Sequence, residues 1–160
     1  MKQEEFKLLF DRYFDSLRSY IYYRCGDKDL ATDVAQEAFI KLWEKQETYE
    51  PKRNVGLLYK MASNLFVSRY RHQKVVDGYA SSFSFVAESE SPEEELLHTE
   101  LQDSYEKALN DLPEKQRTVF LMSRMEELKY EEIAQRLDIS VKAVEKRMHN
   151  ALLYLRKVLL

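Results

Sequence analysis

The chain has 160 residues, of which 33% are charged and 44% hydrophobic, and it contains only three glycines and three prolines. This balance favours helices separated by few sharp turns, in one ordinary domain or two small ones. The sequence has no apolar run as long as a membrane span, its first residues are polar, and its one cysteine, Cys25, cannot form an internal disulfide. We therefore expect no transmembrane helix and no secretory signal, and a cytoplasmic protein in which Cys25 is a packed thiol.

The formal net charge of −3 is unevenly distributed along the chain. Before Asp77 there are 14 Lys and Arg against 11 Asp and Glu, whereas residues 77–102 hold seven acids and no base. Residues 140–160 hold five bases against the single acid Glu145. Because the acid is concentrated in one segment, the net charge does not exclude a protein that binds nucleic acid.

Two helices are predicted at the start of the chain, at residues 4–24 and 29–46. Gly26 and Asp27 should end the first, and Asp29 is the expected cap of the second. The second also has a row of residues at i, i+3, i+4 and i+7: Asp33, Gln36, Glu37 and Ile40. No His or Cys accompanies these carboxylates, so a metal or catalytic site is disfavoured. A solvated face and a surface that docks a partner both remain open, and the apolar Ile40 favours docking.

Residues 46–54 are expected to form a loop, followed by a third helix at residues 55–74. One face of that helix combines bases, amides and hydroxyls with nearby aromatic rings. Rings can stack bases while Lys and Arg follow phosphates, which suits a single-stranded nucleic acid. Aromatic core packing under a solvated rim would give the same composition, so both interpretations remain.

The run from Asp77 to Pro92 loses helical periodicity, is rich in serine and ends in acid, which predicts a flexible linker. Periodicity returns at residues 93–112, and Pro113 is expected at the first position of a further helix. We therefore predict an all-α fold with two small domains, residues 1–76 and 93–160, joined by the linker.

Residues 130–155 predict a helix-turn-helix. Two apolar helical stripes are separated by Asp138-Ile139-Ser140, and Ser140 is well placed to cap the second helix. The second helix carries Lys142, Lys146, Arg147 and Asn150 away from its apolar stripe, where they could reach phosphates and base edges in a major groove. An ordinary helical hairpin with a basic face is the alternative.

Three segments together resemble the extracytoplasmic-function (ECF) class of bacterial RNA polymerase sigma factors, within the sigma-70 family. DVAQEAFIKLWE at residues 33–44 resembles the segment that docks on the clamp helices of the polymerase β′ subunit. LLYKMASNLFVSRYRHQK at residues 57–74 is similar to the segment that opens and reads the −10 element. The run from Leu112 to Lys157, which begins LPEKQRTVF, resembles the region that binds the −35 element.

The resemblance implies site residues, partners and a mechanism. Polymerase-binding candidates are Asp33, Gln36, Glu37 and Ile40. Candidates for the −10 DNA are Lys52, Arg53, Asn54, Lys60, Ser63, Asn64, Arg71 and His72. Candidates for the −35 DNA are Ser140, Lys142, Ala143, Lys146, Arg147 and Asn150. The expected partners are core RNA polymerase, through its β′ clamp helices and β flap, promoter DNA, and an anti-sigma factor, often membrane-bound, that would hold the two domains together. No catalytic residue, cofactor or metal is expected.

The chain departs from the family pattern at Leu57, where tryptophan is frequent, at Ser68, where an acid is frequent, and at Glu127, where glycine is usual. A glycine position occupied by glutamate suggests a left-handed backbone under strain. Two other classes of protein stay open: a helix-turn-helix regulator of the response-regulator output type, and an all-α adaptor that binds only proteins. The first should carry a receiver domain of alternating strands and helices, and the second should show no salt-dependent affinity for DNA.

Overall fold

The computed structural model of the protein describes residues 1–77 and 92–160, with side chains described at 1–72 and 100–160. In these ranges every regular element is an α-helix, which confirms the predicted all-α class. The helices are α1 (Gln3–Cys25), α2 (Lys28–Glu44), α3 (Pro51–Asp77), α4 (Pro92–Asp111), α5 (Glu114–Glu126), α6 (Tyr130–Leu137) and α7 (Val141–Leu159). Apart from its two end residues, the predicted linker lies outside the described residues.

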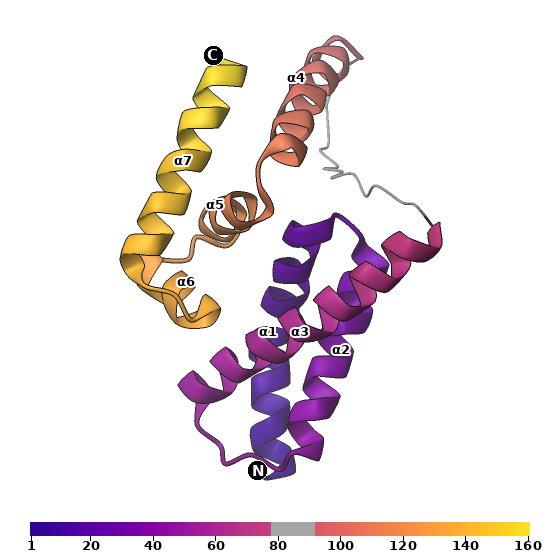
Figure 1. The fold of residues 1–160 in the computed structure, drawn as a ribbon, viewed down its shortest axis with the longest axis vertical. Helices are drawn as coiled ribbons and strands as arrows, with labels where there is room; N and C mark the ends of the chain where they lie inside the picture. The colour runs from indigo at the N-terminus through magenta and orange to yellow at the C-terminus, as the bar shows by residue number, and fades with distance from the viewer. Residues whose placement is uncertain (78–91) are drawn as a thin grey trace.

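Helices α1, α2 and α3 pack against one another and form the amino-terminal unit (Figure 1). Each contributes the apolar stripe that its sequence predicts, because residues three and four apart share one face of a helix. The fully buried side chains include Leu17, Ile21, Val34, Phe39 and Leu58. The opposite faces of α2 and α3 are left for the polar rows described below.

Helices α4 to α7 form the carboxy-terminal unit, in which α5 and α6 both pack on α7, and α4 lies alongside α7 (Figure 1). Its core includes Leu109, Leu121, Ile133 and Val144, each with no exposed surface. Leu101, which the helical periodicity aligned with this stripe, is 70% exposed. Within the described ranges, no helix has both the length and the apolar character needed to cross a bilayer.

Three helix boundaries differ from the sequence-based expectation. The cap of α2 is Asp27, whose carboxylate accepts a hydrogen bond from the Leu30 backbone N–H at 3.1 Å, and not Asp29. Helix α3 begins at Pro51, so the expected loop ends at residue 50; proline is favoured in a first turn because its missing N–H has no helical partner there. Pro113 precedes α5 as its N-cap residue and is not its first helical residue.

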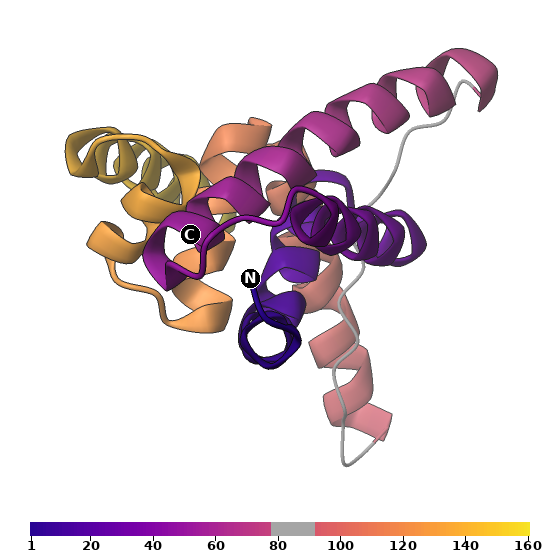
Figure 2. The ribbon, with the colours of Figure 1, turned by 90° about the horizontal axis from the view of Figure 1, so that it is seen from below.

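The two units are in direct contact at two places. Helix α5 lies across the carboxyl end of α1, and α6 lies against the amino-terminal half of α3. Figures 1 and 2 show α6 beside the first turns of α3, with α7 farther out. This contact brings the helix-turn-helix next to the helix that carries the candidate −10 residues.

Candidate nucleic-acid and polymerase interfaces

The helix-turn-helix forms as its sequence predicts. Asp138 ends α6 in the left-handed region (φ 54°), and the Ile139 N–H donates to the Ala134 carbonyl at 3.1 Å. The Ser140 hydroxyl then caps α7 by accepting a hydrogen bond from the Ala143 N–H at 3.0 Å. These caps satisfy backbone groups that helix ends leave unpaired, and they fix the angle between the helices.

The first turns of α7 present the candidate −35 residues on the surface. Ser140, Lys142 and Lys146 are exposed, and Ala143, Arg147 and Asn150 are partly buried. The buried side of the same helix holds Val144 and Met148. The arrangement therefore leaves cationic and amide groups free on the face of α7 that can enter a groove.

The candidate −10 residues are mostly displayed along α3. The exposed ones are Lys52, Arg53, Lys60, Asn64, Arg71 and His72. Arg53 makes an ion pair with Glu47 at 3.6 Å, in which the arginine is 60% exposed. Ser63 is partly buried, and its hydroxyl accepts a hydrogen bond from Arg24 Nη1 at 2.8 Å.

Asn54 has a structural position that the sequence did not suggest. It lies inside α3 with no exposed surface, and its Oδ1 accepts a hydrogen bond from the Glu50 N–H at 2.8 Å. The side chain therefore caps the first turn of α3, and its Nδ2 has no partner among the described residues. A buried amide cannot contact DNA from this position, so we do not retain Asn54 as a DNA candidate.

The polar row on α2 faces outward, with Asp33, Gln36 and Ile40 exposed. Ile40 is 55% exposed, which is high for a large apolar side chain. Glu37 is partly buried and accepts a hydrogen bond from Arg69 of α3, with which it forms an ion pair. This pair fixes the orientation of Glu37 in the row.

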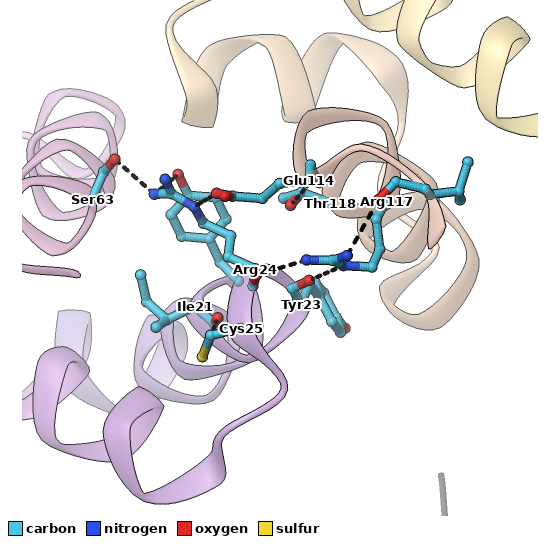
Figure 3. Close-up of polar contacts among 10 residues, drawn as sticks. Ile21, Tyr23, Arg24, Cys25, Ser63, Glu114, Arg117 and Thr118 are labelled. Carbon is cyan, nitrogen blue, oxygen red and sulfur yellow. Dashed lines mark hydrogen bonds and ion pairs between the residues drawn. The ribbon is translucent and has the colours of Figure 1, made fainter. Parts of the chain in front are cut away.

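Two arginines connect the units at the carboxyl end of α1 (Figure 3). Arg117 of α5 is only 9% exposed, and its Nε and Nη2 donate to the Tyr23 and Arg24 carbonyls at 2.8 and 2.7 Å. Its Nη1 lies 3.4 Å from each of the Leu109 and Leu112 carbonyls at the end of α4. The last carbonyls of a helix lack helical partners and carry the negative end of its dipole, so a cation placed there is favoured.

Arg24 extends in the opposite direction across the same contact. It forms an ion pair with Glu114 in the first turn of α5, and Nη1 lies 3.2 Å from the Tyr20 hydroxyl. Its guanidinium also stacks over the Phe66 ring, 4.5 Å from the ring centroid. Beside this cluster Cys25 is buried, with its Sγ 3.3 Å from the Ile21 carbonyl, and burial raises the pKa of the thiol to about 11. The expectation of a packed thiol is therefore correct.

A second group of polar residues lies where α6 meets α3. Arg136 Nη1 donates to the Tyr59 hydroxyl at 3.3 Å, and its guanidinium lies over the Tyr13 and Tyr59 rings. Glu126, at the end of α5, has a buried Oε2 with no hydrogen-bond partner in the described residues. Loss of hydration raises the pKa of Glu126 to about 7, although the nearby Arg136 charge and a hydrogen bond from Ser16 oppose the shift.

Sequence reasoning did not identify Arg24, Arg117, Arg136 or Glu126, because periodicity assigns a residue to a face but not to a partner about 90 residues away. Arg117 did leave a signal: it comes directly before the apolar run TVFLM in a helix whose core it joins. Among the described residues, no cluster of three His, Cys, Asp or Glu side chains could hold a metal ion.

Comparison with known proteins now identifies the family. The family model "Sigma-70 region 2" matches residues 9–75, and "Sigma-70, region 4" matches residues 102–155. The chain is 30% identical over 168 residues to the ECF RNA polymerase sigma factor SigW of Bacillus subtilis, covering 98% of this chain and 90% of that protein. The chain belongs to the ECF class of the sigma-70 family.

Other relatives of this sigma factor agree with the assignment. It is 30% identical to the RNA polymerase sigma-H factor of Pseudomonas aeruginosa over 157 residues, covering 91% of this chain and 81% of that protein. Its fold is similar to that of the sigma factor RpoE of Bartonella quintana, solved in complex with the anti-sigma factor NepR. That comparison has a TM-score of 0.68 and 23% identity, and covers 98% of this chain and 97% of that one.

The family settles the function that the sequence predicted. This protein is a transcription initiation factor that binds core RNA polymerase and directs it to promoters. The response-regulator alternative required strands in the amino-terminal half, and the described part of residues 1–77 is helical without strands. The predicted candidates lie on three helices: the −10 residues on α3, the −35 residues on α7 and the polymerase residues on α2.

Proposed function

We propose that the exposed face of α7 reads the −35 element through its major groove. The observation that carries this proposal is the pairing of a capped helix-turn-helix with exposed cations, Lys142 and Lys146, at the start of its second helix. Arg147 and Asn150, one turn farther along, could add contacts to bases or phosphates. The proposed domain limits are residues 1–76 and 93–160.

We further propose that α3 holds the unpaired strand of the −10 element. Lys52, Arg53 and Lys60 supply positive charge at one end of the helix, and Arg71 and His72 extend it at the other. Asn64 is exposed between them, where an amide can pair with a base edge. Capture of unstacked bases offsets the cost of unpairing, so DNA opening needs no nucleotide hydrolysis and no catalytic residue in this chain.

The polymerase contact is assigned to the outward row of α2. Asp33, Gln36 and Ile40 combine charge, an amide and an exposed apolar side chain on one face, which suits a protein partner better than DNA. We expect this row to meet the clamp helices of the β′ subunit and the second domain to meet the β flap. An anti-sigma factor is a further proposed partner, and the likeness to a sigma factor solved with one supports it.

Transcription with purified components tests these assignments. Core RNA polymerase is mixed with the chain and sheared bacterial genomic DNA, and the run-off transcripts are sequenced. We expect discrete start sites preceded by shared −35 and −10 sequences. Transcripts no different from those of core polymerase alone would contradict the proposal.

Matched variants separate the two DNA and protein surfaces. Lys146→Ala should weaken binding to the enriched promoters and reduce the salt dependence by about one unit of slope, since each phosphate contact contributes about 0.9. Lys157→Ala removes an exposed cation from the far end of α7 and should have little effect.

The polymerase surface has its own controls. Asp33→Ala should weaken binding to core polymerase, whereas Glu44→Ala, an exposed acid at the end of α2, should not. Glu37 requires a second comparison because it pairs with Arg69. If Arg69→Ala weakens polymerase binding as much as Glu37→Ala, the ion pair matters and Glu37 does not contact polymerase directly.

A further inference from the structure

The carboxy-terminal unit covers part of the surface that the proposed function assigns to −10 DNA. A cleft between the units is lined on one side by candidate −10 residues of α3, including Lys60 and Asn64, and on the other by α6 residues 135–138. The helices approach closely at Gly56: a Cβ atom placed there would lie 3.9 Å from the Gln135 carbonyl oxygen. Helix α6 therefore stands over the first half of α3, where an unpaired DNA strand would have to lie.

The same contact engages individual DNA candidates. The Ser63 hydroxyl is bound by Arg24, which is itself paired with Glu114 of the other unit. Arg147 of the recognition helix lines a second cleft together with Tyr20, Arg24 and Ser63. Candidates from both proposed DNA surfaces therefore face the junction between the units.

The contact is built from specific polar bonds. Arg117 fills a buried position with hydrogen bonds to two carbonyls of α1, and Arg136 binds Tyr59 on α3. Buried cations are favoured only where such partners are in place, so these bonds hold for one relative position of the two units. Accidental proximity of two tethered domains would not supply them.

We propose that this is a self-inhibited state, in which the helix-turn-helix unit closes over the −10 surface until core polymerase separates the two units. The proposal rests on the assignment of α3 to −10 DNA. The polymerase row on α2 remains outward in the same structure, with Asp33, Gln36 and Ile40 exposed. Polymerase can therefore dock on the closed protein, and access to promoter DNA follows opening, which fixes the order of binding without a separate inhibitor.

A wedge at Gly56 tests the closure without removing any of its bonds. Gly56→Trp places a large side chain against the α6 backbone and should open the units, whereas Gly56→Ala adds only a Cβ at ordinary contact distance. Small-angle X-ray scattering on the full chain should show a larger radius of gyration for the tryptophan variant alone. Unchanged dimensions in that variant would overturn the proposed contact between α6 and α3.

DNA affinity then tests the inhibition itself. Binding of a fluorescein-labelled, mixed-sequence single-stranded 20-mer is measured at low salt for both variants. The wedge should bind at least about ten-fold more tightly, because the apparent affinity scales with the fraction of open protein. If Gly56→Trp opens the units but the affinity equals that of Gly56→Ala, self-inhibition is wrong.

Adding Lys60→Ala to the wedge separates this failure from failure of the proposed function. Loss of the gained affinity in the double variant shows that α3 binds the strand. Tight binding by the wedge that Lys60→Ala leaves unchanged, even when combined with Arg71→Ala, means that the strand binds elsewhere and that the −10 assignment fails. The tryptophan itself would then be the source of the gain, and the closure would not protect a DNA surface.

The reverse experiment locks the closed state. Cysteines are introduced at Gly56 and Gln135 in a Cys25→Ala background and joined by a thiol-cleavable bismaleimide. The locked protein should still bind core polymerase but give no run-off transcripts, and reduction should restore them. Full transcription by the cross-linked protein, or failure of the two cysteines to cross-link, would overturn the proposal.

Discussion

The two contacts between the helical units differ in how completely their polar groups are satisfied. At the end of α1, Arg117 donates to carbonyls at ordinary hydrogen-bond distances, and Arg24 pairs with Glu114. Where α6 meets α3 there is an open cleft, and Glu126 keeps a buried oxygen without a partner. A satisfied buried network resists change, whereas an unsatisfied group costs free energy that separation recovers. The difference suggests that the units part first at α3 and α6 and hinge at α1 and α5.

The largest effect should come from Arg117→Ala. The change leaves the carbonyls of α1 and α4 without their buried donor, and we expect a loss of about 3 kcal/mol in the free energy of unfolding. Urea denaturation followed by circular dichroism measures it. Arg124→Ala removes an exposed cation from the same helix and should change stability by less than about 0.5 kcal/mol. Equal effects of the two variants would show that the α1 contact contributes nothing to stability.

Glu114→Gln should have an intermediate effect, because it removes only the charge that Arg24 meets. Glu114 is 41% exposed, so solvent screening limits the expected loss to about 1 kcal/mol. The control is Asp15→Asn, which breaks the exposed pair with Arg18 inside α1 and should be nearly neutral. A Glu114→Gln variant as stable as the control would show that this bridge does not hold the units.

The unsatisfied contact predicts a dependence on pH. The pKa of Glu126 is raised to about 7, so the closed protein binds the Glu126 proton more tightly than the unfolded chain does. Stability should therefore be greatest at low pH for this group, fall between about pH 4.5 and 7, and level off above pH 7. The groups that act on Glu126 or are affected by its charge are Ser16 and Tyr23 of α1, Tyr59 of α3 and Arg136 of α6.

Comparison with Glu126→Gln isolates that contribution from the histidines and all other titrating groups. Urea denaturation is measured at pH 5.5 and pH 8 for both proteins. The loss of stability between the two pH values should be smaller in the variant, because an amide cannot ionise. Identical pH profiles would exclude Glu126 as the group responsible.

The smallest effect concerns the residue next to Glu126. Glu127 adopts a left-handed backbone with φ 55°, as its place at a usual glycine position suggested. Glu127→Gly should raise the free energy of unfolding by about 0.5 to 1 kcal/mol, since glycine adopts this conformation without steric cost. Glu127→Ala should give no such gain. Scattering dimensions should stay the same in both, which separates strain in the turn from opening of the units.

Local structure was largely readable from the sequence. Apolar spacing predicted the helices and Ser140 predicted the cap of α7, because these features depend on residues within one or two turns of each other. The errors were also local: Asp27 was passed over for Asp29, and Pro51 was placed in a loop when it begins α3. In both cases two neighbouring residues suited the same position, and tertiary packing chose between them.

The contacts between the units were beyond such reasoning. Arg24 and Arg117 interact with groups about 90 residues away, and a basic side chain on a helix predicts a solvated surface unless its partner is known. Asn54 is the converse case, since it resembles a DNA-binding amide in sequence and is a buried cap in the structure. Exposure of Lys60, Asn64, Lys142 and Lys146 agrees with their proposed roles, which await the experiments above.

Cys25 has a practical consequence. It is the single thiol of the chain, it is 3% exposed at the end of α1 beside the Arg117 contact, and burial raises its pKa to about 11. Alkylating agents react with thiolates that they can reach, so modification of the resting protein should be slow. Its labelling rate in a mass spectrometer therefore supplies a native clock for fraying of that helix end, with no probe added to the molecule.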